Sequence, residues 1–137
     1  MEETRALKSH GKTAGFVKAH RSLSEVLTDH ELASLGDAYI NFAYALALSN
    51  RKGKPLGAKV KGTILAEALK RAGLREHLPA RMSRHMLADA AEALIVYGWL
   101  NSYVTLEESV STLMEFANSV EGLTQLLVKI KNRVKFS

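Results

Sequence analysis

Three acidic side chains lie in helical stretches that are otherwise mostly apolar. Asp37 belongs to the run Leu32–Ile40, and Asp89 and Glu92 belong to the similar run Leu87–Ile95. Asp89 and Glu92 are three positions apart, so they share one face of a helix. Carboxylates that only solubilise a helix are less expected among Leu, Ala and Ile. If the two runs face each other, the three carboxylates gather into one cluster.

Such a cluster would have a defined chemistry. Like charges in a partly apolar site repel one another and lose hydration, so a cation usually neutralises them. The chain has no cysteine, and with oxygen donors only the expected ion is Mg²⁺ or Mn²⁺. The residues alone leave a second interpretation open, in which each carboxylate faces solvent near a Lys or Arg.

The positive charges are concentrated in two stretches. The chain carries a formal charge of +5, and every charge between Asp37 and Glu67 is positive. The residues of this first basic stretch are Arg51, Lys52, Lys54, Lys59 and Lys61. The second stretch comprises Lys129, Lys131, Arg133 and Lys135. Two basic stretches suit a polyanionic partner such as RNA, although solvated loops and a frayed tail have the same composition.

Length and composition indicate one domain in a reducing compartment. A chain of 137 residues buries enough surface to fold without disulfides. The N-terminal residues lack the order of a secretory signal, and no apolar run has the ~20 residues of a membrane span. We therefore expect a cytoplasmic protein without a membrane anchor.

The pattern of apolar residues predicts an all-α domain of five or six helices over residues 1–137, with no strand. A first helix, 3–20, is interrupted by glycines. The expected helices after it are 28–49, 58–72, 83–100 and 105–133. The first of these opens with the capping box Thr28–Glu31, and the second ends at Gly73. The last opens with a second capping box at Thr105 and bends near Gly122. The apolar runs exceed one helix face, which favours a dimer interface.

Two of these stretches resemble motifs of the ribonuclease III family. Leu35–Ala38 is similar to the end of the family's signature motif, Leu87–Ile95 to its second motif, and Val60–Glu67 to its connecting helix. The likeness covers about residues 28–100, and a helical segment, 105–134, follows. It implies an all-helical, homodimeric endoribonuclease that hydrolyses double-stranded or structured RNA with Mg²⁺. Asp37, Asp89 and Glu92 would then be the catalytic residues and metal ligands, and the first basic stretch would bind RNA.

Two positions depart from the classical family pattern. Ala33 and His30 stand where classical members have Glu, and Glu31 lies on the opposite side of the helix from Ala33. Ala at this position resembles the mini-ribonuclease III branch, whose members lack a double-stranded RNA-binding domain and are nucleases. The alternatives are a non-catalytic RNA-binding or ribonucleoprotein component with an incomplete acidic site, and a purely structural helical domain.

Two histidines share the stripes of the acidic residues. His30 lies two turns before Asp37, and His85 lies one turn before Asp89. Both are candidate accessory groups, as metal ligands or phosphate contacts, or ordinary surface residues. For the aromatic residues, such as Tyr39 and Trp99, we expect packing in the core or at a dimer interface rather than base stacking.

Overall fold

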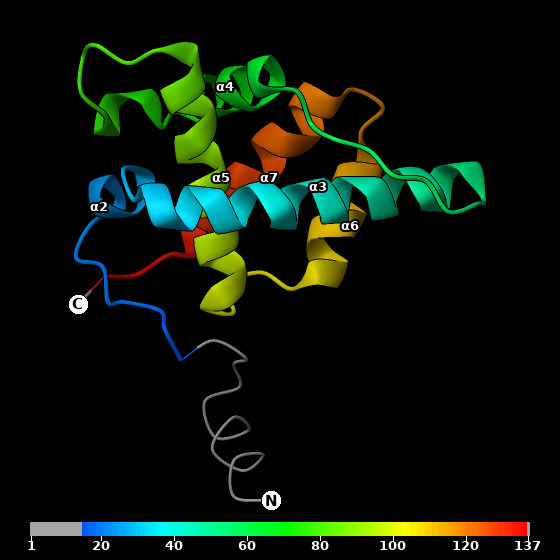
Figure 1. Ribbon diagram of the computed structural model, residues 1–137, viewed down its shortest axis with the longest axis horizontal. Coiled ribbons are helices and arrows are strands. Elements are labelled where there is room, and N and C mark those ends of the chain that lie inside the picture. The colour runs from blue at the N-terminus through cyan, green and yellow to red at the C-terminus, as the bar shows by residue number, and fades with distance from the viewer. Residues whose placement is uncertain (1–14, 137) are drawn as a thin grey trace, which may run out of the picture.

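The computed structural model describes residues 15–136, which form six α-helices, one short 3₁₀ helix and no strand (Figure 1). The elements are α2 (Leu23–Leu27), α3 (His30–Lys52), α4 (Gly62–Arg71), η1 (Arg75–His77), α5 (Arg84–Leu100), α6 (Leu106–Glu115) and α7 (Ser119–Arg133). The expected all-α fold is confirmed. Most of the helix expected over 3–20 lies outside the described residues, and its described end, 15–20, is not helical.

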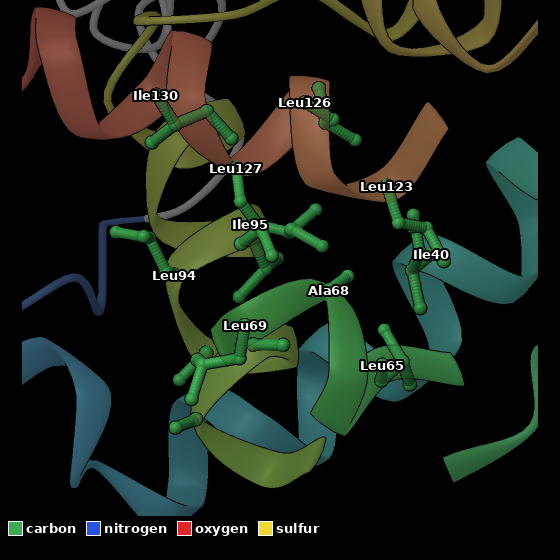
Figure 2. Packing of buried hydrophobic residues seen from close by; sticks show 14 of the residues in the cluster. Ile40, Leu65, Ala68, Leu69, Leu94, Ile95, Leu123, Leu126, Leu127 and Ile130 are labelled. Atoms are coloured by element: carbon green, nitrogen blue, oxygen red, sulfur yellow. The ribbon is translucent and has the colours of Figure 1, made fainter. Parts of the chain in front are cut away.

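Helix α5 is the centre of the molecule. Apart from the charged residues in its first half, it is largely apolar, and its residues Ala90–Val96 are buried, including Leu94 and Ile95 at 0% exposure. A helix with this pattern has to be surrounded by others, and α5 packs against α2, α3, α4 and α7. Figure 2 shows the resulting core, in which side chains of α3, α4 and α7 meet those of α5.

The start of α3 differs from the expectation by two residues. Its N-cap is Asp29, whose carboxylate accepts the Leu32 N–H at 3.0 Å. The capping box expected at Thr28 is wrong, because Thr28 ends α2 and its hydroxyl donates to the Ser24 carbonyl. Sequence alone could not separate two adjacent capping residues, since the short helix α2 competes for the first of them.

The later boundaries follow local signals more closely. Helix α3 ends at Gly53, and α4 ends just before Gly73, and both glycines have the left-handed φ of a helix end, 73° and 77°. Helix α4 begins only at Gly62, because the preceding residues form an extended linker between α3 and α4. Helix α5 begins within one residue of the expected start, and the Ser83 side chain caps it by accepting the Met86 N–H.

The expected long helix over 105–133 is divided in two. Thr105 caps α6 by accepting the Glu108 N–H at 3.0 Å, as predicted. The chain then breaks at residues 116–118 rather than bending at Gly122, because the Asn118 side chain accepts two backbone N–H groups and starts α7. Gly122 lies inside α7, where a Cβ atom would be in ordinary contact with Leu113 of α6.

Over residues 15–136, no helix combines the length and the apolarity that crossing a membrane requires.

Candidate functional site

The two acidic stretches face each other where α3 crosses α5. Gly36 sits at the crossing, and a Cβ atom there would overlap the backbone carbonyl of Glu92. Only glycine permits this approach of two helix backbones. The next residue along α3 is Asp37, so the crossing places its carboxylate beside α5 and close to Glu92.

A pocket of about 430 Å³ lies beside this crossing. Its walls come from α3, α4, α5 and the end of the linker between α3 and α4. The ionisable side chains that line it are Asp37, Asp89, Glu92, His30, His85 and Lys59. The structure therefore brings together all three acidic candidates, both histidine candidates and one of the five candidate RNA-binding residues.

Glu92 is the most deeply placed of the acidic side chains, at 7% exposure. Its burial raises the pKa of Glu92 to about 8, helped by a hydrogen bond with Asp37 and by the negative charges of Asp37 and Asp89. Lys59 acts in the opposite direction but does not overcome these effects. At neutral pH this raised pKa favours the protonated form of Glu92.

Asp37 has a second partner that the sequence patterns did not indicate. The side-chain amide of Asn41 donates to Asp37 Oδ1 at 2.9 Å, and its oxygen accepts the Val60 N–H at 2.7 Å. Asn41 follows Asp37 by one helical turn, and this spacing was the available signal. This spacing gave no indication of the second partner of Asn41, the Val60 N–H in the linker.

Three carboxyl groups line one pocket. The pKa of Glu92 is raised first by burial and then by its acidic neighbours, Asp37 and Asp89. Within the described part of the chain, no group of three or more Asp, Glu or His side chains is arranged so that it could hold a metal ion.

Ala33 contributes an apolar surface to the same pocket. It is 5% exposed and lines the wall with His30 and Asp37, one turn from each. The carboxylate that classical members carry at this position is thus replaced by a methyl group, which ligates nothing.

The other members of the first basic stretch do not line the pocket. Lys52, Lys54 and Lys61 are exposed at the end of α3, in the linker and at the start of α4. The guanidinium of Arg51 donates to the carbonyls of Leu113, Met114 and Phe116, so it caps the end of α6.

The second basic stretch is largely engaged within the fold. Lys129 donates to Thr112 at 2.9 Å, and Lys131 donates to the carbonyl of Ala72 at 3.0 Å. Arg133 forms a pair of 2.7 Å hydrogen bonds with the Glu108 carboxylate, which lowers the pKa of Glu108. These cations hold α7 against α4 and α6.

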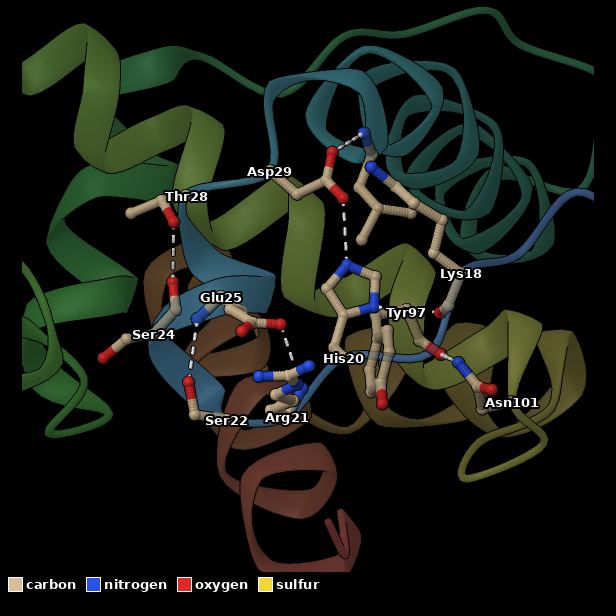
Figure 3. Close-up of polar contacts among 11 residues, drawn as sticks. Lys18, His20, Arg21, Ser22, Ser24, Glu25, Thr28, Asp29, Tyr97 and Asn101 are labelled. Carbon is tan, nitrogen blue, oxygen red and sulfur yellow. Dashed lines mark hydrogen bonds and ion pairs between the residues drawn. The ribbon is translucent and has the colours of Figure 1, made fainter. Parts of the chain in front are cut away.

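A polar network fixes the start of α3 next to the pocket (Figure 3). His20 Nε2 lies 2.9 Å from Asp29 Oδ2, while the other Asp29 oxygen caps α3. Burial alone would raise the pKa of Asp29, but the hydrogen bonds from His20 and the Leu32 backbone, with the charge of Lys18, lower it. The edge of the His20 ring also contacts Tyr97 of α5. The position of His30 at the pocket is therefore anchored to α5.

The aromatic candidates support the core rather than the pocket. Tyr39 stacks on Trp99 with ring centroids 5.2 Å apart, and the Tyr39 hydroxyl hydrogen-bonds with Ser109 at 2.9 Å. Both residues pack against the hydrophobic core, as expected.

Comparison with known proteins accounts for this arrangement. The family model described as Ribonuclease III matches residues 30–134, which include all the acidic side chains of the pocket. No curated protein matches the chain. The match spans most of the sequence, and the chain belongs to the ribonuclease III family.

Proposed function

We propose that this protein is an endoribonuclease that cleaves double-stranded or structured RNA and depends on Mg²⁺ or Mn²⁺. The observation that carries the proposal is the convergence of Asp37, Asp89 and Glu92 on one pocket inside a ribonuclease III domain. Membership of the family supports RNA as the partner. The cytoplasmic location expected from the sequence stays a prediction.

Asp37, Asp89 and Glu92 would hold the cation through their carboxyl oxygens, with His30 and His85 as accessory groups at the edge of the pocket. A bound divalent cation activates water for attack on phosphorus and neutralises charge on the phosphodiester. Because the pKa of Glu92 is raised, a cation bound here would displace a proton from this carboxyl group.

Lys59 is the basic residue best placed to hold the RNA backbone at the pocket. Its ammonium group lies near enough to Glu92 to lower the pKa of that carboxyl group. The exposed lysines at positions 52, 54 and 61 would contact phosphates farther from the cleaved bond.

A homodimer is part of the proposal. Phe42 and Leu35 lie seven positions apart on one face of α3 and are 56% and 38% exposed. A mainly apolar groove of about 540 Å³ lies beside this face, between α3 and α6, and its lining includes Leu46, Val110 and Met114. A second copy of the chain would bury both surfaces, and the pair would offer two acidic pockets to the two strands of a duplex.

One observation favours a second function. Ala33 removes a potential ligand from the wall of the pocket, so the protein could bind RNA without cutting it. In that case it would be an RNA-binding or ribonucleoprotein component that retains the fold.

The deciding experiment compares wild type with Asp37→Asn and Glu92→Gln on a labelled RNA duplex, with Mg²⁺ or with EDTA. We expect cleavage by wild type with Mg²⁺ only, and a loss of at least about 100-fold in both variants. Binding in EDTA should weaken as salt rises, because phosphate contacts release counterions.

Lys59→Ala should reduce cleavage more than Lys52→Ala, which removes the same charge outside the pocket. Salt-sensitive binding without cleavage at any Mg²⁺ or Mn²⁺ concentration would establish the non-catalytic alternative. Failure to bind RNA would exclude both functions.

A further inference from the structure

We propose that Asn41 is a positioning residue that fixes the Asp37 carboxylate and the Lys59-bearing linker in one arrangement, an inference that rests on the proposed function. Asn41 lies in α3, between the acidic cluster and the linker, and its side chain bonds to both. It therefore couples an acidic group of the pocket to the position of its one lining lysine.

The partners of Asn41 determine how its amide is oriented. The Val60 N–H can only donate, so it requires the amide oxygen, which it meets at 2.7 Å. The Asp37 carboxylate then faces the amide NH₂ group at 2.9 Å. Among side chains of this length, only Asn supplies a donor and an acceptor at once, whereas Asp at this position would repel Asp37 and Leu would bond to neither.

The bond to Val60 constrains its neighbour Lys59. Both residues line the acidic pocket, and fixing the Val60 N–H also fixes the peptide that carries the Lys59 carbonyl. A lysine side chain has four flexible carbons, so an anchored backbone restricts the volume that its ammonium group samples. Loss of Asn41 would release this restriction and one orienting bond of Asp37 together.

A second side chain fastens the same linker and provides a matched control. The Ser49 hydroxyl accepts the Leu56 N–H at 2.9 Å and donates to the Leu56 carbonyl at 3.3 Å. Ser49 lies two turns farther along α3 and does not line the acidic pocket. Ser49→Ala therefore loosens the linker without touching a carboxylate.

The test measures Mn²⁺ affinity and backbone amide exchange in wild type, Asn41→Leu and Ser49→Ala. Free Mn²⁺ is followed by electron paramagnetic resonance, and exchange is followed by NMR on metal-free protein. We expect Asn41→Leu to weaken Mn²⁺ binding by about 10-fold or more, as for other groups that orient a ligand, and to speed exchange at Val60. Ser49→Ala should speed exchange at Leu56 and leave Mn²⁺ affinity within about twofold of wild type.

A further variant tests the coupling without metal. Asp37→Ala removes the acceptor of the Asn41 NH₂ group, so it should speed exchange at Val60 although it does not contact that residue. This measurement decides the inference even if Asn41→Leu fails to fold.

The outcomes separate the inference from the proposed function. Unchanged Mn²⁺ affinity in folded Asn41→Leu, an equal loss in Ser49→Ala, or unchanged Val60 exchange in Asp37→Ala would overturn the positioning role. If wild type itself binds no Mn²⁺, the metal-dependent function is lost, and Val60 exchange in Asp37→Ala alone determines whether Asn41 links the two segments.

Discussion

Glu92 shows what a buried carboxyl group costs when it lies beside two others. The helix crossing at Gly36 places Glu92 among apolar walls and next to Asp37, and the raised pKa follows from both facts. The native protein therefore binds a proton here that the unfolded chain has already released. A folded pKa above the unfolded one favours the native state at low pH, and this advantage is lost as pH rises toward the folded pKa.

We predict that the free energy of unfolding of the metal-free protein falls as pH rises from about 4.5 to about 8, the ordinary and the raised pKa of Glu92. The contribution of this group is on the order of a few kcal/mol. Glu92→Gln should remove it, because the amide has no charge and still donates to Asp37. Urea unfolding of wild type and Glu92→Gln at pH 5, 6.5 and 8 gives the difference in their free energies of unfolding. The contributions of other titrating groups are the same in both proteins and cancel in this difference. Parallel pH profiles would contradict the prediction.

Cation binding should reverse this dependence. Mg²⁺ or Mn²⁺ has to displace the Glu92 proton, so the rise in melting temperature at a fixed metal concentration should be larger at pH 8 than at pH 6. Differential scanning fluorimetry measures it, with Glu92→Gln as the control. A shift that is equal at both pH values would place the cation elsewhere.

Three glycines differ in what surrounds them. At Gly36, where α3 crosses α5, the neighbour is the Glu92 backbone, which cannot move without displacing α5. At Gly98 a Cβ would lie 2.8 to 2.9 Å from the Ile130 side chain of α7, which would have to shift within the buried core. At Gly57, in the linker, nothing lies within 4 Å.

These surroundings predict a graded effect of alanine substitution. Gly36→Ala should lower the free energy of unfolding by about 3 kcal/mol or more, and Gly98→Ala by about 1 to 2 kcal/mol. Gly57→Ala should change it by less than about 0.5 kcal/mol. Chemical unfolding orders the three variants. A Gly36→Ala protein as stable as Gly57→Ala would mean that the helices do not cross as described.

Arg51 illustrates how a basic residue can belong to the fold rather than to a ligand site. Its Nη2 group donates to three carbonyls at the end of α6, where a helix leaves carbonyl groups without a partner within the helix. Lysine keeps the charge but carries it on a compact ammonium group that does not reproduce the shape of the guanidinium.

We therefore expect Arg51→Lys to lower the free energy of unfolding by about 1 kcal/mol and Lys52→Ala to change it by less than about 0.5 kcal/mol. Thermal unfolding compares them. If Arg51→Lys were as stable as wild type but bound RNA less tightly, the residue would serve the RNA interface instead.

The molecule as a whole has an acidic pocket on one side of α3 and exposed apolar side chains on another. A single copy leaves Phe42 largely in contact with water, and the groove between α3 and α6 leaves further apolar surface uncovered. Self-association through α3 would bury this surface while leaving the pocket open.

Phe42→Glu is predicted to convert a dimer to a monomer, because it would bury a charge at the centre of the proposed interface. Sedimentation equilibrium measures the mass. Phe16→Glu is the control, since Phe16 is exposed but lies outside α3. A monomeric wild type, or a dimer that persists in Phe42→Glu, would exclude this interface.

The sequence by itself determined the all-α class, both ends of α5, the end of α4, the start of α6 and the acidic side chains that line the pocket. These follow from short-range physics: apolar periodicity, capping at Thr105, and a left-handed glycine at position 73. Local signals gave the wrong start for α3, because Thr28 and Asp29 are both capping residues. They also missed the division of 105–133, which the cap at Asn118 produces.

The tertiary structure settled which charged groups serve the pocket. Arg51 and Lys59 are equivalent in a list of basic residues, yet one caps α6 and the other lines the acidic pocket. Asn41 is an unremarkable polar residue until the linker returns along α3 to meet it. Such roles depend on contacts between residues far apart in the chain, which local periodicity and capping do not encode. The raised pKa of Glu92 likewise depends on burial that exists only after α3 and α5 have packed.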